Sequence, residues 1–367
     1  MTPMLLSALA FSLLAQISRA ALPPSGHVAA WLYDTKGGAS AEWSAALAGF
    51  NAKAKHPINV AFSYGGDMEY YPPPTGPQTY FPADAAAAAA TYRSGTAGVE
   101  YVVAVIDGRM DGGQPYSPDL SRRTQAEVEA WADKTASLLC SHDQVDGVQM
   151  DLEPFAAPYL PRLLQFLARL SANLRSRERG CADDGHHPTG RSLSAFMFAA
   201  AATPEVWRAL GPNGYVTVSG YDLAPAPAGT PSTPAAYRAQ LDEVLATIAP
   251  LADANNGSFV VGIPAAASCH EFERYSFANG TVVQGHPQQQ YLEAALQAIS
   301  DAKLHSNARF LGTALWGFAS KMAYPPQSDN TFTPGTPFVD KGEEDFLQTY
   351  TWGARGADSN AQGNTLT

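Results

Sequence analysis

Residues 145–154 have the sequence VDGVQMDLEP, in which apolar and polar side chains alternate. The two-residue repeat of a β-strand places the apolar side chains on one face and Gln149, Asp151 and Glu153 on the other. An ionised carboxylate inside a protein is costly unless it is paired, hydrogen-bonded or protonated. Two carboxyls on one strand face also interact, so one of them can hold a proton at neutral pH and act as a general acid. The stretch therefore predicts a strand that packs through one face and carries catalytic groups on the other.

Short apolar runs like this one alternate along the chain with longer segments of helical periodicity. Strands are predicted at residues 27–33, 58–64, 101–106, 145–152, 193–199, 215–220, 259–263 and 310–316. Helices are predicted at residues 41–55, 83–92, 125–140, 158–179, 204–210, 234–251, 288–303 and 341–352. Eight strands that are each followed by a helix are typical of a (β/α)8 barrel, whose strands are apolar because both faces of the sheet are buried. We therefore expect an α/β fold with a single TIM barrel at residues 21–352 and a flexible C-terminal tail at residues 353–367.

The composition is that of a folded, acidic protein. The 367 residues are 46% apolar and 16% charged, with 23 Lys and Arg against 34 Asp and Glu and a net charge of −11. This composition excludes a disordered or collagen-like chain, and the lack of a basic stretch argues against recognition of a phosphate backbone. Beyond the N-terminal segment, no run approaches the ~20 apolar residues of a transmembrane helix. We expect a monomer with neither a nucleic-acid partner nor an integral membrane contact.

The first 20 residues have the pattern of a secretory signal peptide. Residues 5–15 form an apolar run that is too short to span a bilayer, and Ser18 and Ala20 supply the small side chains of a cleavage site. Residues 1–4 carry no basic side chain, which leaves a hydrophobic N-terminal extension as the alternative. We expect cleavage after Ala20 and secretion of the mature chain.

The cysteines and the glycosylation sequons agree with secretion without requiring it. Cys140, Cys181 and Cys269 allow at most one internal disulfide, and its pairing stays open. Asn256 and Asn279 begin N-glycosylation sequons, which also arise by chance. The Cys and His residues match no standard zinc spacing, so we expect neither a metal nor a cofactor.

The C-terminal ends of the strands are where a (β/α)8 barrel places its active site. The polar and aromatic residues at these ends are Tyr33, Asp34, Asp67, Asp107, Tyr221, Asp222 and Trp316. An Asp at the end of a strand is often only a turn or helix-capping residue, and that alternative applies to each of the first three Asp taken singly. Their convergence on one rim nevertheless favours a site. No Lys or Arg lies within the predicted strands to pair with Asp151 or Glu153, and no acid directly follows the seventh strand.

Residues 146–153 resemble the DGxDxDxE signature of family 18 glycoside hydrolases, the chitinases and their relatives. The sequence INVAF at residues 58–62 is similar to the second strand of that family, and Tyr221 with Asp222 is similar to the Y-D of its sixth strand. Trp316 holds the place of the tryptophan on the family's last strand. The resemblance spans about residues 28 to 320 and implies a glycosidase that acts on β-linked N-acetylglucosamine glycans.

The resemblance also implies a role for each matching residue. Glu153 would protonate the leaving glycosidic oxygen, Asp151 would orient the acetamido group of the substrate, and Tyr221 would hydrogen-bond the acetamido carbonyl. The residues expected to bind substrate are Asp222, Trp316, Gln149, Tyr33 and Asp107. In this mechanism the acetamido oxygen attacks the anomeric carbon, so no carboxylate of the enzyme serves as nucleophile and no cofactor takes part.

Gln149 departs from the signature, which has an Asp at this position. Without that proton-sharing partner, we expect Asp151 to be more acidic or differently oriented. The departure leaves open a carbohydrate-binding protein that has lost turnover, or a hydrolase for a sugar without the acetamido group, although retention of Asp151 and Glu153 favours an active enzyme. Residues 265–287 are too few for the α+β insertion of deep-cleft chitinases, so we expect a barrel without it.

Overall fold

The structure is a computed structural model that describes residues 22–32, 40–72, 74–94, 97–112, 116–183, 185–223, 232–265, 271, 273–276, 281–284, 286–316 and 341–350. The predicted signal peptide and C-terminal tail lie outside these residues, as do Tyr33, Asp34, Cys269 and Asn279.

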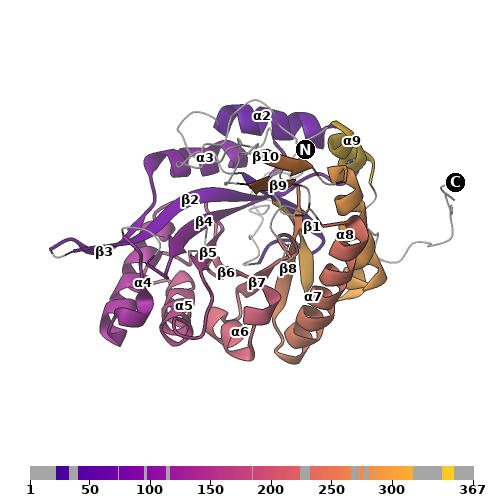
Figure 1. Cartoon of the computed structure of the whole chain (residues 1–367). Helices are drawn as coiled ribbons and strands as arrows, with labels where there is room; N and C mark the ends of the chain where they lie inside the picture. The colour runs from indigo at the N-terminus through magenta and orange to yellow at the C-terminus, as the bar shows by residue number, and fades with distance from the viewer. Residues whose placement is uncertain are drawn as a thin grey trace, which may run out of the picture.

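Eight parallel strands close into a barrel (Figure 1). They are β1 (His27–Leu32), β2 (Val60–Tyr71), β4 (Tyr101–Arg109), β5 (Gly147–Glu153), β6 (Ser192–Met197), β7 (Gly214–Ser219), β8 (Ser258–Pro264) and β11 (Phe310–Trp316). The ring closes because β1 pairs with both β11 and β2. Most strand residues are buried, since one face fills the barrel interior and the other lies under the helices. The predicted (β/α)8 fold is confirmed.

Helices form the outer layer of the barrel (Figure 1). They are α2 (Ser40–Asn51), α3 (Ala83–Arg93), α4 (Gln125–Cys140), α5 (Leu160–Leu174), α6 (Pro204–Leu210), α7 (Pro234–Ala254), α8 (Gln288–Asp301) and α9 (Lys341–Thr349). α4 has its predicted bounds because Thr124 and Glu127 form a capping box at its start. α5 ends five residues before its predicted end at residue 179, where the carbonyl of Leu174 accepts the N–H of Arg191. Within the described residues, no helix is long and apolar enough to cross a membrane.

Two strands run three or more residues past their predicted ends, and this extension shapes the rim. β2 continues to Tyr71 and pairs antiparallel with β3 (Gly76–Tyr80), so that a hairpin projects from the barrel (Figure 1). Gly66 permits this approach, because its φ is +116° and a Cβ there would collide with the carbonyl oxygen of Tyr80. β4 continues three residues beyond its predicted end, to Arg109. Rim residues expected in loops therefore lie on strands and have fixed neighbours.

A short antiparallel hairpin of β9 (Glu273–Ser276) and β10 (Thr281–Gln284) lies between β8 and α8. No larger element is present among the described residues of this region, in agreement with the expected absence of an α+β insertion.

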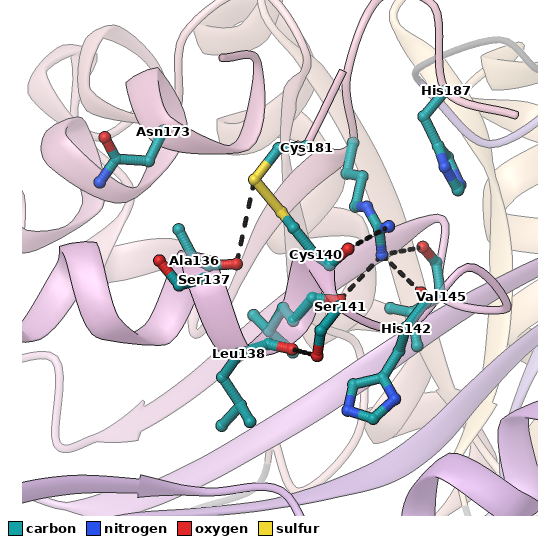
Figure 2. Close-up of a disulfide and its surroundings, with 12 residues drawn as sticks. Ala136, Ser137, Leu138, Cys140, Ser141, His142, Val145, Asn173, Cys181 and His187 are labelled. Atoms are coloured by element: carbon teal, nitrogen blue, oxygen red, sulfur yellow. Dashed lines mark hydrogen bonds between the residues drawn. A yellow bond between two sulfur atoms is a disulfide. The ribbon is translucent and has the colours of Figure 1, made fainter. Parts of the chain in front are cut away.

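A disulfide joins Cys140, the last residue of α4, to Cys181 in the segment that precedes β6 (Figure 2). The guanidinium of the buried Arg191 donates hydrogen bonds to backbone carbonyls beside it. These carbonyls belong to Leu139, Cys140, His142 and Val145. The disulfide and Arg191 together tie the segment before β6 to the end of α4 and to the turn that leads into β5.

Asp146 begins the family-like signature but lies at the opposite end of β5 from Glu153. It is 1% exposed, forms an ion pair with Arg93 and lies 3.3 Å from Nε2 of His187. Its Oδ2 also accepts the N–H of Val102 at 2.8 Å. Asp146 therefore stabilises the N-terminal end of the barrel, away from the rim where the strands end.

Candidate active site

Three carboxyl groups form a row across neighbouring strands at the C-terminal rim. Asp67 on β2 is in register with Asp107 on β4, and Asp107 is in register with Asp151 on β5. In-register residues of parallel strands point to the same face of a sheet, so the three side chains lie side by side. The turn or capping role considered for Asp67 and Asp107 is wrong, because both are strand residues within the barrel mouth.

The three carboxyl groups of this row would repel one another if all were ionised. Burial and the charge of Asp151 raise the pKa of Asp107 well above its usual range, with further contributions from Asp67 and Glu153. Burial and the charge of Glu153 raise the pKa of Asp151 to about 8. Oδ1 of each of these two carboxyls is buried and has no hydrogen-bond partner among the described residues. The two carboxyls therefore favour the protonated form more than free Asp side chains do. The expectation that Gln149 makes Asp151 more acidic or differently oriented stays a prediction.

Asp67 has a different environment from its two neighbours. Its Oδ2 accepts a hydrogen bond from the hydroxyl of Tyr64 at 2.5 Å. Burial raises the pKa of Asp67, and this hydrogen bond opposes the rise. Asp67 is thereby oriented at the outer end of the row, next to Asp107.

Glu153 lies one step further along β5, opposite Arg109 on β4. Nη1 of Arg109 is 3.9 Å from Oε2 of Glu153, while Nη2 of Arg109 is 2.8 Å from Oδ2 of Asp111. Burial raises the pKa of Glu153 and Arg109 opposes this, while Asp111 and Asp222 add to the rise. The Glu153 side chain is still 42% exposed, so a substrate can reach it. The expectation of no basic partner failed because Arg109 is part of β4 and, two residues beyond Asp107, faces the same side.

Gln149 occupies the layer below Asp151 on the same face of β5. Its side chain is fully buried, in register with Val105 and Ser194. Within the part of the chain that the structure describes, neither of its amide atoms has a hydrogen-bond partner. The structure therefore places Gln149 under the carboxyl row, inside the barrel.

Aromatic rings occupy the other part of the barrel mouth. Tyr221, which follows β7, and Trp316, which ends β11, lie parallel with their ring centroids 5.3 Å apart and an interplanar angle of 4°. Trp31 on β1 meets both edge-on, at 5.5 Å from Trp316 and 6.2 Å from Tyr221. Phe196 on β6 stacks on Tyr221 at 5.9 Å. Trp31 and Phe196 were not expected at the site, although both belong to predicted strands.

Asp222 connects the aromatic group to the carboxyl groups. It adopts a left-handed backbone with a φ of 54°, and its negative charge raises the pKa of both Glu153 and Glu271. Glu271 is fully buried although it lies seven residues beyond the end of β8. No acid directly follows β8 in the sequence, and no local sequence pattern predicted that Glu271 would lie near the site.

A cavity of about 320 Å³ opens beside Glu153, between the ends of β4, β5 and β6. It is lined by Arg109, Glu153, Pro154, Phe155, Phe196, Met197, Phe198, Ala200 and Ala201. Asp151, Tyr221 and Trp316 do not line it. Glu153 therefore lies at the wall of this largely apolar cavity.

Across the described residues, no three His, Cys, Asp or Glu side chains are arranged to hold a metal ion. The segment before β6 contains Cys181 and His187. His187 contacts Asp146, and Cys181 forms the disulfide. Of the expected site residues, the structure brings together Asp107, Asp151 and Glu153 on one side of the barrel mouth. It brings Tyr221, Asp222 and Trp316 together on the other, while Tyr33 lies outside the described residues.

No protein-family model matches this sequence, and no curated protein matches it either. Solved structures do match the fold. The C-terminal domain of a putative chitinase from Desulfitobacterium hafniense DCB-2 has a TM-score of 0.52 at 12% identity, covering 88% of this chain and 97% of that one. The Bacillus cereus spore cortex-lytic enzyme SleL has a TM-score of 0.51 at 12% identity, covering 91% of this chain and 76% of that one. Identities this low establish the shared barrel fold and nothing finer.

Proposed function

We propose that this protein is a glycoside hydrolase that cleaves β-linked N-acetylglucosamine glycans by substrate-assisted, retaining catalysis. The observation that carries the proposal is that Glu153, with its raised pKa, the Asp107–Asp151 pair and the parallel rings of Tyr221 and Trp316 all lie at the C-terminal ends of the strands. Two solved barrels with TM-scores above 0.5 bear the names of a putative chitinase and a spore cortex-lytic enzyme, which supports this class of substrate.

In the proposed first step, the acetamido oxygen of the bound sugar attacks its anomeric carbon and the bond to the leaving oxygen breaks. Glu153 delivers its proton to that oxygen, for which its raised pKa suits it at neutral pH. The intermediate is a cyclic oxazolinium cation. With one proton held by the neighbouring Asp107, the carboxylate of Asp151 would stabilise this cation as it forms.

In the second step, water attacks the anomeric carbon and the ionised Glu153 takes its proton, which restores the acid and regenerates the acetamido group. The product then has the configuration of the substrate. Tyr221 would hydrogen-bond the acetamido carbonyl, Trp316 would support the apolar face of the ring and Asp222 would bind the same sugar. The substrate supplies the nucleophile, so the proposed reaction uses neither metal nor cofactor.

The leaving group would occupy the 320 Å³ cavity beside Glu153. Glu153 lines this cavity, whereas Asp151, Tyr221 and Trp316, which would hold the acetamido sugar, do not. Its apolar wall suits the flat face of a sugar ring, since sugars commonly pack their C–H faces on aromatic side chains.

We also propose that the mature chain is secreted and acts as a monomer. The disulfide between Cys140 and Cys181 supports passage through an oxidising compartment. The exposed position of Asn256, in the turn between α7 and β8, supports its use as a glycan acceptor. Size-exclusion chromatography of protein purified from culture medium tests both points, and retention inside the cell or a stable dimer would contradict them.

The function is tested with aryl glycosides of chitobiose and chitotriose. The parent should release the aryl group and a product of retained anomeric configuration, measured by NMR at early times. Glu153→Gln should lower kcat by about 100-fold or more. Glu243→Gln, at an exposed position on α7, is the matched control and should keep the parent rate. Binding of chitooligosaccharides without turnover by the parent would instead identify a carbohydrate-binding protein.

A further inference from the structure

Glu271 is an acid that the mechanism above does not use. Its side chain is fully buried, and its Oε1 accepts a hydrogen bond from the backbone N–H of Leu223 at 2.9 Å. Its Oε2 is also buried and has no hydrogen-bond partner among the described residues. A buried carboxyl group is costly, so one that is retained beside a site needs an explanation.

The hydrogen bond from Leu223 holds the turn that carries Tyr221 and Asp222. Asp222 has a φ of 54°, a left-handed conformation that is uncommon for residues with a Cβ, although Asp adopts it more readily than most. The start of the turn is held by Ser219, whose hydroxyl donates to the carbonyl of Tyr221 at 2.7 Å. Glu271 holds the other end, directly after Asp222.

The position of this turn affects both the aromatic rings and the proposed acid Glu153. The ring of Tyr221 lies parallel to that of Trp316, so a shift of the turn breaks this stack. The charge of Asp222 acts on Glu153, so the same shift changes the pKa of the proposed acid. A group that holds the turn therefore acts on the sugar-binding surface and on the acid together.

We infer that Glu271 is a positioning residue, whose carboxyl group clamps the turn after β7 so that Tyr221 and Asp222 face the bound sugar. This inference rests on the proposed function for its catalytic consequence, but the clamp itself is a property of the fold. Glu271 does not touch the reacting atoms, and it acts through Leu223 and Asp222.

The protonation of Glu271 is linked to the charge of Asp222. Burial and the charge of Asp222 raise the pKa of Glu271 to about 7, and the backbone N–H groups of Asp222 and Leu223 oppose the rise. Among the described residues, Tyr291 on α8 also interacts with Glu271, and its own pKa is raised by burial and by the charge of Glu271. Glu153 lies beyond Asp222. When Glu271 is protonated, it places no second negative charge next to Asp222, and its carboxyl group still accepts the N–H of Leu223.

Two variants distinguish the role of Glu271 as a hydrogen-bond acceptor for Leu223 from the role of its negative charge. Glu271→Gln keeps a carbonyl oxygen for Leu223 and mimics the protonated acid, whereas Glu271→Ala removes the acceptor. With an aryl chitobioside, kcat/KM of the Ala variant should fall about 100-fold, as expected for a small misplacement of binding groups. The Gln variant should stay close to the parent below neutral pH and should lose the inflection that the parent shows near the pKa of Glu271. Glu243→Ala on α7 is the matched control.

Hydrogen exchange at the backbone amide of Leu223 tests the clamp without any substrate. Exchange should be slow in the parent and in Glu271→Gln, and fast in Glu271→Ala. Unchanged exchange in the Ala variant, or a Gln variant as impaired as the Ala variant, would overturn the inference. If the parent shows no turnover, the proposed function fails while the exchange experiment still judges the clamp. If the Ala variant does not fold, an inflection that persists in Glu271→Gln overturns the link to Asp222.

Discussion

Asp107 and Asp151 occupy the same register position on the neighbouring parallel strands β4 and β5. Each has a buried Oδ1 with no hydrogen-bond partner in the described part of the chain, and the pKa of each is raised. Gln149 stands where the family signature has an acid on the same strand as Asp151. A second carboxyl does lie beside Asp151 across the sheet, that of Asp107, and two adjacent buried carboxyls favour a shared proton.

The raised pKa of Asp151 should make stability depend on pH. An Asp side chain ordinarily has a pKa of 3.8, whereas that of Asp151 is about 8 in the folded protein, so folding favours the protonated acid. The contribution of Asp151 to stability is therefore fully present below about pH 4 and is lost as the pH rises to about 8. Asp151→Asn should raise the free energy of unfolding at pH 8 by at least ~1 kcal/mol, with a smaller gain at lower pH.

Urea denaturation at several pH values measures this difference. Asp143→Asn, at an exposed position before β5, is the control and should show no such trend. A destabilised Asp151→Asn at pH 8 would show that the carboxylate is favourably bound in the folded state. The gain in stability should be accompanied by a loss of activity, as is common for groups kept for function.

Arg109 should set the alkaline limb of the pH profile. It lowers the pKa of Glu153 and also pairs with Asp111, whose charge raises that pKa. Arg109→Gln removes this positive charge, which raises the pKa of Glu153. Because protonated Glu153 is the proposed acid, the alkaline limb of kcat/KM should move up by roughly half a pH unit, a modest shift because both side chains are partly exposed.

The control for this shift is Arg122→Gln, since Arg122 is 79% exposed and pairs with Asp119 outside the site. The two variants are compared through full pH profiles of kcat/KM. Movement of the limb to lower pH in Arg109→Gln would contradict the proposed role of Glu153.

Trp316 should contribute to sugar affinity through its flat face. Its ring lies parallel to that of Tyr221 at 5.3 Å, so the two aromatics form one packed surface. In the Glu153→Gln background, where bound sugar is not hydrolysed, Trp316→Ala should weaken binding of chitotriose about tenfold. Trp316→Phe keeps a smaller flat face and should lose less. Calorimetric titration gives both values, and equal affinities in all three proteins would remove Trp316 from the site.

The disulfide should affect stability and leave catalysis unchanged. Cys140 and Cys181 are 41 residues apart and join α4 to the segment before β6, near the N-terminal ends of the strands. Replacing both by Ser should lower the free energy of unfolding by about 2–4 kcal/mol, because the unfolded chain gains freedom. The rate per folded molecule at low temperature should equal that of the parent. A lower kcat would show that the two ends of the barrel are coupled.

Much of the barrel was predictable because its signals are local. The alternation in residues 147–153 predicts both the strand β5 and the face that carries Asp151 and Glu153. Predicted and observed bounds agree for α4 and for β11, where periodicity and end signals coincide. The predictions failed where strands continued through polar residues, as in β4, since side chains such as Arg109 do not look like strand interior.

The sequence by itself determined the barrel, the acidic face of β5 and the aromatic and acidic residues at the strand ends, because each depends on a repeat within a few residues. Only the tertiary structure decided that Asp107 stands beside Asp151, that Arg109 faces Glu153, and that Glu271 reaches Leu223. These contacts depend on the register between strands and on the path of loops back over the rim. Register is set by the closure of the whole ring and loop paths by packing against it, so no local stretch of sequence specifies either one.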